Sequence, residues 1–104
     1  MTSHELPLIQ LSAYEDIAGI ADSVERYAGQ TAADRITSKT LGGIDLLAST
    51  PYLGPLQQDP ILARSGYRKL VVGKYVVVYR VYEGRATVLR IFHGPSNYVS
   101  KVDG

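Results

Sequence analysis

The sequence predicts an α+β protein in which two helices cover one face of a small antiparallel sheet. Three observations support this prediction. The stretch from Gly66 to His93 holds three apolar runs separated by the pairs Gly73-Lys74 and Glu83-Gly84, which are typical of tight hairpins. Two segments of the first half repeat their apolar residues at helical spacing. Almost no linker separates these two segments, so we expect an antiparallel helical hairpin.

Length and composition narrow the class of protein. A chain of 104 residues is predicted to be a single domain, with its core over about residues 6–98. The absence of cysteine excludes disulfides and thiolate chemistry, and no metal or other cofactor is expected. No apolar run approaches the roughly 18 residues of a membrane span, so we expect a cytoplasmic protein that does not contact membranes.

The first elements are a short strand and a helix. Leu6 to Leu11 is apolar and contains Pro7, which suits an edge strand because proline cannot donate to a ladder. Ser12-Ala13-Tyr14-Glu15 has the spacing of a capping box and predicts the start of the first helix. Gly29 is a typical residue for the end of that helix.

A second helix is predicted from Thr31 to about Ala48. Gly42-Gly43 lies inside it and indicates either a close approach to the first helix or a break. From Thr50 to Ser65, three prolines and Gly54 predict an irregular connecting loop.

Two-residue turns fix the register of the three-stranded meander, so each face of the sheet can be assigned. The helix-covered face is predicted to carry Arg68, Leu70, Val72, Tyr75, Val77, Tyr79, Val81, Ala86, Val88, Arg90 and Phe92. The open face is predicted to carry Tyr67, Lys69, Val71, Val76, Val78, Arg80, Tyr82, Arg85, Thr87, Leu89, Ile91 and His93. A buried Arg90 would need a carboxylate or carbonyl partner, for which Asp45 and a helix end are both candidates.

Charge is distributed unevenly along the chain. Up to Pro60 the chain has eight acidic and three basic residues, and from Ile61 onward it has eight basic and two acidic residues. The basic sheet half suggests a polyanion or an acidic protein partner, although solvated cations that protect a sheet edge would look the same.

Several short motifs, taken in order, resemble a known family. These are Leu46-Leu47 with Pro51 and Gly54, then Gly66-Tyr67-Arg68-Lys69-Leu70, the strand from Tyr75 to Val81, and Val88-Leu89-Arg90-Ile91-Phe92-His93-Gly94 with Tyr98. Their order and spacing resemble the RelE/ParE superfamily of bacterial toxins over nearly the whole chain. The resemblance implies the toxin of a type II toxin-antitoxin pair, neutralised by a cognate antitoxin.

The resemblance leaves three functions open. RelE-like toxins cleave mRNA on the ribosome, which would block translation, and ParE-like toxins inhibit DNA gyrase without being nucleases. A third reading is an inactive toxin fold that survives as a binding module. Val76 and Ser96 stand where the RelE-like and ParE-like patterns, respectively, carry arginine. The oligomeric state, a homodimer or a hetero-oligomer with the antitoxin, is also open.

Most of the candidate site residues come from the predicted open face; Arg68 lies near an edge of the helix-covered face, and Tyr98 follows the sheet. For a metal-free RNA cleavage, His93 would exchange protons while Arg80 and Lys69 hold phosphate. A strand-end histidine bonded to a carbonyl is the alternative for His93. Residues expected to bind RNA or another target are Tyr67, Arg68, Tyr82, Arg85 and Tyr98.

An apolar patch on the same face is the predicted antitoxin-binding surface. Its members are Val71, Val76, Val78, Leu89 and Ile91. A helical hairpin covers only one sheet face, so such a patch would be exposed, and exposed apolar patches usually bind a partner. The alternative cover is the C-terminus of the chain itself.

Overall fold

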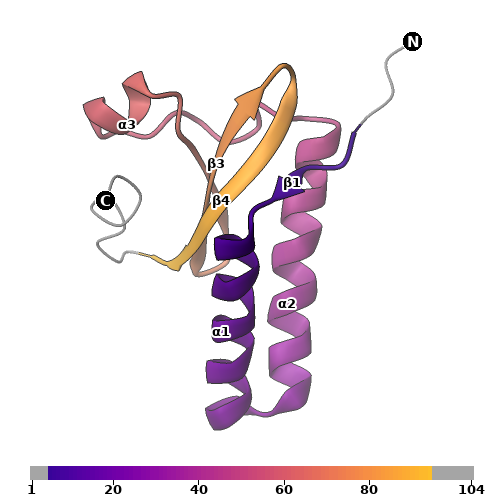
Figure 1. Ribbon diagram of the computed structural model, residues 1–104. Coiled ribbons are helices and arrows are strands. Elements are labelled where there is room, and N and C mark those ends of the chain that lie inside the picture. The colour runs from indigo at the N-terminus through magenta and orange to yellow at the C-terminus, as the bar shows by residue number, and fades with distance from the viewer. Residues whose placement is uncertain (1–4, 95–104) are drawn as a thin grey trace.

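The computed structural model describes residues 5–94, and these residues form a helical hairpin packed on a four-stranded sheet (Figure 1). Among them, no helix is long and apolar enough to cross a membrane. In chain order the elements are β1 (Leu8–Ile9), α1 (Leu11–Ala28), α2 (Gln30–Asp45), a 3-10 turn (Leu46–Ala48), α3 (Pro60–Arg64), β2 (Arg68–Val72), β3 (Tyr75–Tyr82) and β4 (Arg85–His93). The predicted α+β plan is confirmed.

The sheet order is β1-β4-β3-β2, with β1 parallel to β4 and the other two pairs antiparallel. The predicted N-terminal strand is present but only two residues long, so it covers β4 at Thr87 and Val88 alone. Both tight turns close where the sequence indicates, since Val72 pairs with Tyr75 and Tyr82 pairs with Arg85.

Helices α1 and α2 lie side by side and run in opposite directions (Figure 1). Gly29 joins them with φ of +93°, a left-handed conformation that glycine adopts without steric cost. The predicted capping box is wrong: Gln10 is the N-cap of α1, and no side chain caps the helix. Ser12 instead lies inside α1 and donates its hydroxyl to the Leu89 carbonyl.

Helix α2 continues through Gly42-Gly43, so these glycines do not mark a break. The close approach that Gly43 permits is to β2, and the predicted approach to the first helix is wrong. A Cβ on Gly43 would lie 2.7 Å from Val72 Cγ2, so the missing side chain lets α2 approach β2 closely. A Cβ on Gly42 would meet nothing within 4 Å.

We predict opposite effects for the same substitution at these two neighbours. Gly42→Ala should raise the free energy of unfolding by about 0.5–1 kcal/mol, because alanine is the better helix former and has room. Gly43→Ala should lower it by about 1–3 kcal/mol through overpacking against the stiff Val72 side chain. Urea unfolding followed by circular dichroism measures both, and a destabilised Gly42→Ala or an unaffected Gly43→Ala would contradict this account of the packing.

The segment predicted to be an irregular loop contains a short helix, α3. Asp59 caps it by accepting the N–H groups of Ile61 at 3.0 Å and Leu62 at 3.1 Å, and Pro60 occupies the first helical position. This Asp-Pro pair is a helix-start signal that the prediction of an irregular loop did not take into account.

Gly54 anchors the rest of this segment to the sheet. Its N–H donates to the buried Tyr79 hydroxyl at 2.8 Å, and its carbonyl accepts from Arg68 Nη1 at 2.8 Å. The Arg68 guanidinium also lies over the Tyr52 ring at 4.9 Å. Burial raises the pKa of Tyr79, while the Gly54 hydrogen bond and the Arg68 charge oppose that rise.

The core lies between the hairpin and the sheet. Its buried members are Ala13, Ile44, Leu47, Tyr75, Val77, Tyr79, Ala86, Val88 and Ile91. Leu70, Val72 and Val81 are partly buried against it. The predicted helix-covered face is therefore confirmed up to Val88 on the last strand.

A β-bulge reverses the prediction beyond Val88. Tyr79 pairs with Val88, but its neighbour Val78 pairs with Arg90, so Leu89 is an extra residue in β4. One extra residue moves every later side chain to the other face. The assignments of Arg90 and Phe92 to the helix-covered face, and of Ile91 and His93 to the open face, are wrong for this reason.

Candidate functional site

The open face of the sheet carries a stacked arrangement of two tyrosines and one arginine. The Arg80 guanidinium lies 5.0 Å from the Tyr67 ring centre and 4.8 Å from that of Tyr82. Tyr67 comes just before β2, whereas Arg80 and Tyr82 are two residues apart on one face of β3. Two rings that enclose a guanidinium hold its plane in place and leave its edge N–H groups available to an anion.

The basic residues of the sheet differ in whether they already have hydrogen-bond or ion-pair partners. Arg68 Nη1 donates to the Gly54 carbonyl, and Arg85 Nε donates to the Leu6 carbonyl at 2.7 Å with Glu5 at 3.8 Å. Within residues 5–94, neither Arg80 nor Lys69 pairs with a carboxylate. We call Tyr67, Lys69, Arg80 and Tyr82 the open-face cluster.

His93 does not join the open-face cluster. It is the Cα partner of Tyr75, and the two rings meet edge to face with centres 5.3 Å apart. Tyr75 belongs to the core beneath the hairpin, so the His93 ring lies on the helix side of the sheet. In the part of the chain that the structure describes, no three acidic or histidine side chains gather as a metal site would require.

The three residues expected to cleave RNA are therefore not brought together. Arg80 lies five residues beyond Tyr75 on β3, which corresponds to roughly 17 Å along the strand at about 3.4 Å per residue. The side chains of Arg80 and of His93, the partner of Tyr75, also occupy opposite faces of the sheet. Tyr98, a further expected target-binding residue, lies outside the described residues.

The predicted contiguous apolar patch is also corrected by the structure. Val78 is fully buried and Ile91 is only 2% exposed, the latter because the bulge directs it into the core beneath the hairpin. Val76 and Leu89 are half-buried, and Val71 alone is largely exposed, at 60%. The five residues thus do not form one exposed surface.

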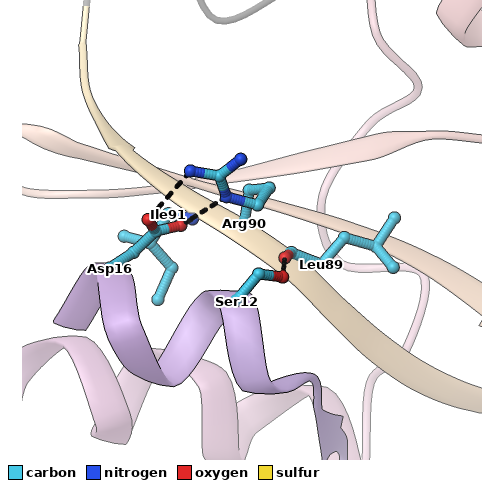
Figure 2. A network of polar contacts seen from close by, with 5 residues as sticks. All are labelled: Ser12, Asp16, Leu89, Arg90 and Ile91. Carbon is cyan, nitrogen blue, oxygen red and sulfur yellow. Dashed lines mark hydrogen bonds and ion pairs between the residues drawn. The ribbon is translucent and has the colours of Figure 1, made fainter. Parts of the chain in front are cut away.

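Figure 2 shows a polar network that joins α1 to β4. Arg90 donates from Nε and Nη2 to the two carboxylate oxygens of Asp16 at 2.8 and 3.0 Å, and the Ile91 N–H donates to Asp16 Oδ2 at 2.8 Å. The hydrogen bond to Asp16 raises the pKa of Arg90, more than its partial burial lowers it. The predicted need of Arg90 for a carboxylate is met, and the partner is Asp16.

Asp16 is not among the predicted site residues, although its spacing from Ser12 is a sequence signal for its role. Ser12 and Asp16 are four residues apart and share one face of α1. Both reach the side of β4 that β1 leaves uncovered after Val88, where Ser12 meets the Leu89 carbonyl and Asp16 meets the Ile91 N–H. Polar residues at this spacing, on the side of the helix that meets the sheet, indicate bonding to a strand edge.

Comparison with known proteins agrees with this architecture. A solved structure described as the chromosomal ParDE toxin-antitoxin system from P. aeruginosa superposes with a TM-score of 0.72 at 21% sequence identity, covering 88% of this chain and 98% of that one. No curated protein matches the sequence. The chain has the fold of the RelE/ParE superfamily toxins.

A family model identifies the branch of the superfamily. The model described as the ParE toxin of the type II toxin-antitoxin system parDE matches residues 8–98. This chain belongs to the ParE toxin family.

Proposed function

We propose that this toxin acts by binding DNA gyrase and blocking it, without cleaving RNA, and that a cognate antitoxin neutralises it. Membership in the ParE family supports the type of toxin. The observation that carries the choice of mechanism is the separation of His93 from Arg80 and Lys69 on opposite sheet faces.

Cleavage of a phosphodiester needs its proton-transfer group and its phosphate-binding cations around one scissile bond, at hydrogen-bonding distance. Roughly 17 Å of strand, estimated from the rise per residue, separate the positions of His93 and Arg80. A rotamer change cannot close such a gap across a sheet. The arrangement favours a toxin whose surfaces bind and hold their target.

The open-face cluster is the surface that we propose contacts the target. Arg80 and Lys69 lack carboxylate partners in the described part of the chain, and Tyr82 is 47% exposed beside them. Arginine and tyrosine are typical of the few residues that contribute most of the affinity at protein interfaces. Arg68 and Arg85 are less suited to the role because backbone carbonyls already occupy them.

Two assays on the purified toxin separate the alternatives. We expect supercoiling by gyrase to be inhibited, and we expect mRNA on translating ribosomes to remain uncut at toxin concentrations that inhibit gyrase. Codon-specific mRNA cleavage with unimpaired gyrase would refute the proposal and restore the nuclease reading. A protein inert in both assays would point to the binding module.

Substitutions in the two candidate regions should have unequal effects. Arg80→Ala should raise the concentration needed to inhibit gyrase about tenfold, since it removes a charged contact prearranged by two rings. His93→Ala should change that concentration less than about twofold, because His93 faces away from the proposed surface. Arg64→Ala, which removes an exposed arginine on α3, serves as the matched control. If His93→Ala abolishes inhibition while Arg80→Ala does not, the proposed contact surface is wrong.

A further inference from the structure

Exposed apolar side chains gather on the segment that borders one edge of the sheet. β2 is the last strand in the sheet order, and the chain between α2 and α3 runs along its outer side (Figure 1). On this segment Tyr52 is 59% exposed, and Leu53 and Leu56 are each 45% exposed. Single exposed leucines are common, but three large apolar side chains within five residues form a patch, which usually binds a partner. We call these three residues the edge surface.

The backbone beneath the edge surface is fixed to the sheet. The Lys69 N–H donates to the Pro55 carbonyl at 3.0 Å, and the Gln57 N–H donates to the Tyr67 carbonyl at 2.9 Å. The side chains are therefore presented on an ordered segment, and a partner does not have to order it on binding. Because this segment already occupies that stretch of the β2 edge, a partner meets side chains there and cannot add a strand.

The edge surface adjoins the open-face cluster. Leu56 pairs with Arg68 in an antiparallel bridge, and the Arg68 guanidinium lies over the Tyr52 ring at 4.9 Å. Arg68 stands in the chain between Tyr67 and Lys69, which belong to the open-face cluster, and its side chain points to the opposite side of the sheet. A stack of arginine on tyrosine therefore lies on each side of the β2 edge.

The open-face cluster is too small to bind a protein by itself. A stable interface buries about 800 Å² on each partner, from roughly 20 residues or more, whereas this cluster has four. Contact with a protein target has to extend onto neighbouring surface. Toward β1, the Leu6 carbonyl occupies Arg85, and Glu5 adds a negative charge. Toward β2, the edge surface offers the aromatic and apolar side chains that are typical of the centre of an interface.

We propose that the edge surface is a second part of the contact with gyrase, and that it binds an apolar area of the gyrase protein and not the DNA that gyrase holds. This inference rests on the proposed function and adds where the contact extends and what chemistry it has. A DNA backbone is bound by cations that are free to meet its phosphates. Arg68 already donates to the Gly54 carbonyl, and the three side chains of the edge surface are uncharged.

The geometry of this edge also predicts the shape of the partner site. Arg68 and Tyr52 lie on one side of β2, and Arg80 with Tyr67 lies on the other. A protein that contacts both stacks has to enclose the edge between them. We therefore expect this toxin to insert the β2 edge of its sheet into a concave site on gyrase.

The first test removes the exposed ring. Binding of the toxin to purified gyrase without DNA is measured by surface plasmon resonance. We expect Tyr52→Ala to raise the Kd about tenfold or more, since tyrosine is among the residues that contribute most of the affinity at interfaces. Tyr14→Ala is the matched control, because Tyr14 is 53% exposed on α1, which packs against β4 and not against β2. This control should change the Kd less than about twofold.

The second test places a charge in the area that we expect to be covered. Leu56→Asp would bury a carboxylate against an apolar partner and should raise the Kd at least about tenfold. Leu11→Asp makes the same change at the exposed first residue of α1 and should alter the Kd less than about twofold. Circular dichroism and thermal unfolding check that each variant folds, so that a weaker complex reports on the surface.

The behaviour of the unaltered chain separates failure of this proposal from failure of the proposed function. If the unaltered chain binds and inhibits gyrase while Tyr52→Ala and Leu56→Asp bind as tightly as their controls, the edge surface is wrong and the proposed function stands. An unaltered chain that neither binds nor inhibits gyrase would overturn both.

Two further probes address other occupants of the edge surface. Affinity for a short DNA duplex, measured by fluorescence anisotropy, should be the same for Tyr52→Ala and the unaltered chain, and a loss in the variant would assign the surface to nucleic acid. Binding of the purified product of the adjacent reading frame should also be unchanged. Loss of that binding with intact binding of gyrase would assign the surface to the antitoxin, and either loss would overturn the proposal.

Discussion

Gly54→Ala is expected to lower the free energy of unfolding by about 3–4 kcal/mol, the largest effect of any single substitution proposed for this protein. A Cβ at this position would lie 2.2 Å from the Lys69 carbonyl oxygen and 3.0 Å from Tyr79 Cε1. The first of these atoms belongs to the backbone of β2 and cannot rotate away. The segment must therefore move outward and break the hydrogen bonds that join Gly54 to Tyr79 and Arg68.

Thermal and urea unfolding measure this effect. For a domain of this size we expect a decrease in Tm of roughly 15 °C or more. Gly19→Ala is the matched control, because a Cβ there meets nothing within 4 Å and alanine favours the helix. Tyr79→Phe leaves the steric environment unchanged and removes only the hydroxyl that binds Gly54, so it should cost about 1–3 kcal/mol. A Gly54→Ala protein as stable as the parent would show that this segment is not held as described.

Asp16→Ala is expected to lower the free energy of unfolding by about 2–3 kcal/mol. The substitution leaves both the Ile91 N–H and the Arg90 guanidinium without their carboxylate acceptor. The Asp16 side chain is 16% exposed and that of Arg90 32%, so water can compensate only in part.

The same helix offers a control for this second prediction. Asp22 forms an ion pair with Arg26 whose N–O distance, 2.8 Å, equals that between Asp16 and Arg90. Its side chains are 66% and 76% exposed, so solvent screens the pair, and Asp22→Ala should leave stability nearly unchanged. Equal costs for the two substitutions would mean that burial and the Ile91 N–H contribute nothing to the Asp16 network.

Much of the sheet could be predicted because tight turns act locally. Gly73-Lys74 and Glu83-Gly84 each fix a hairpin by the conformations of two residues, and the pairing they impose holds from Arg68 to Val88. Helical spacing likewise identified the hairpin of α1 and α2. These signals depend on near neighbours in the chain, so a single sequence carries them.

The bulge at Leu89 was not predictable by the same means. Val88, Leu89 and Ile91 are all apolar, so the alternation of apolar and polar residues gives no sign of the extra residue in β4. The Asp16 carboxylate binds the N–H of Ile91 just beyond the bulge, which is a contact between residues 75 positions apart. The misplacement of His93, and with it the proposed catalytic trio, follows from this one long-range feature.

The two long helices show the opposite error, in which a local sequence signal predicts a feature that the structure does not have. Ser12 and Glu15 have the spacing of a capping box, yet the Ser12 hydroxyl binds the sheet and the helix begins before it. In α2 the cost of Gly42-Gly43 is offset by the close contact with Val72. In both places tertiary contacts outweigh the preference of the isolated segment.

The short length of β1 has a consequence for solubility. A strand edge with free N–H and C=O groups is a template on which another chain can add a strand, and repeated addition leads to aggregates. Here β1 ends early, and the Ser12 hydroxyl and Asp16 carboxylate occupy the next positions of that edge. A partly buried carboxylate at the edge cannot donate a hydrogen bond to an incoming backbone carbonyl, so α1 protects β4 from unwanted self-association where a longer β1 would otherwise be needed.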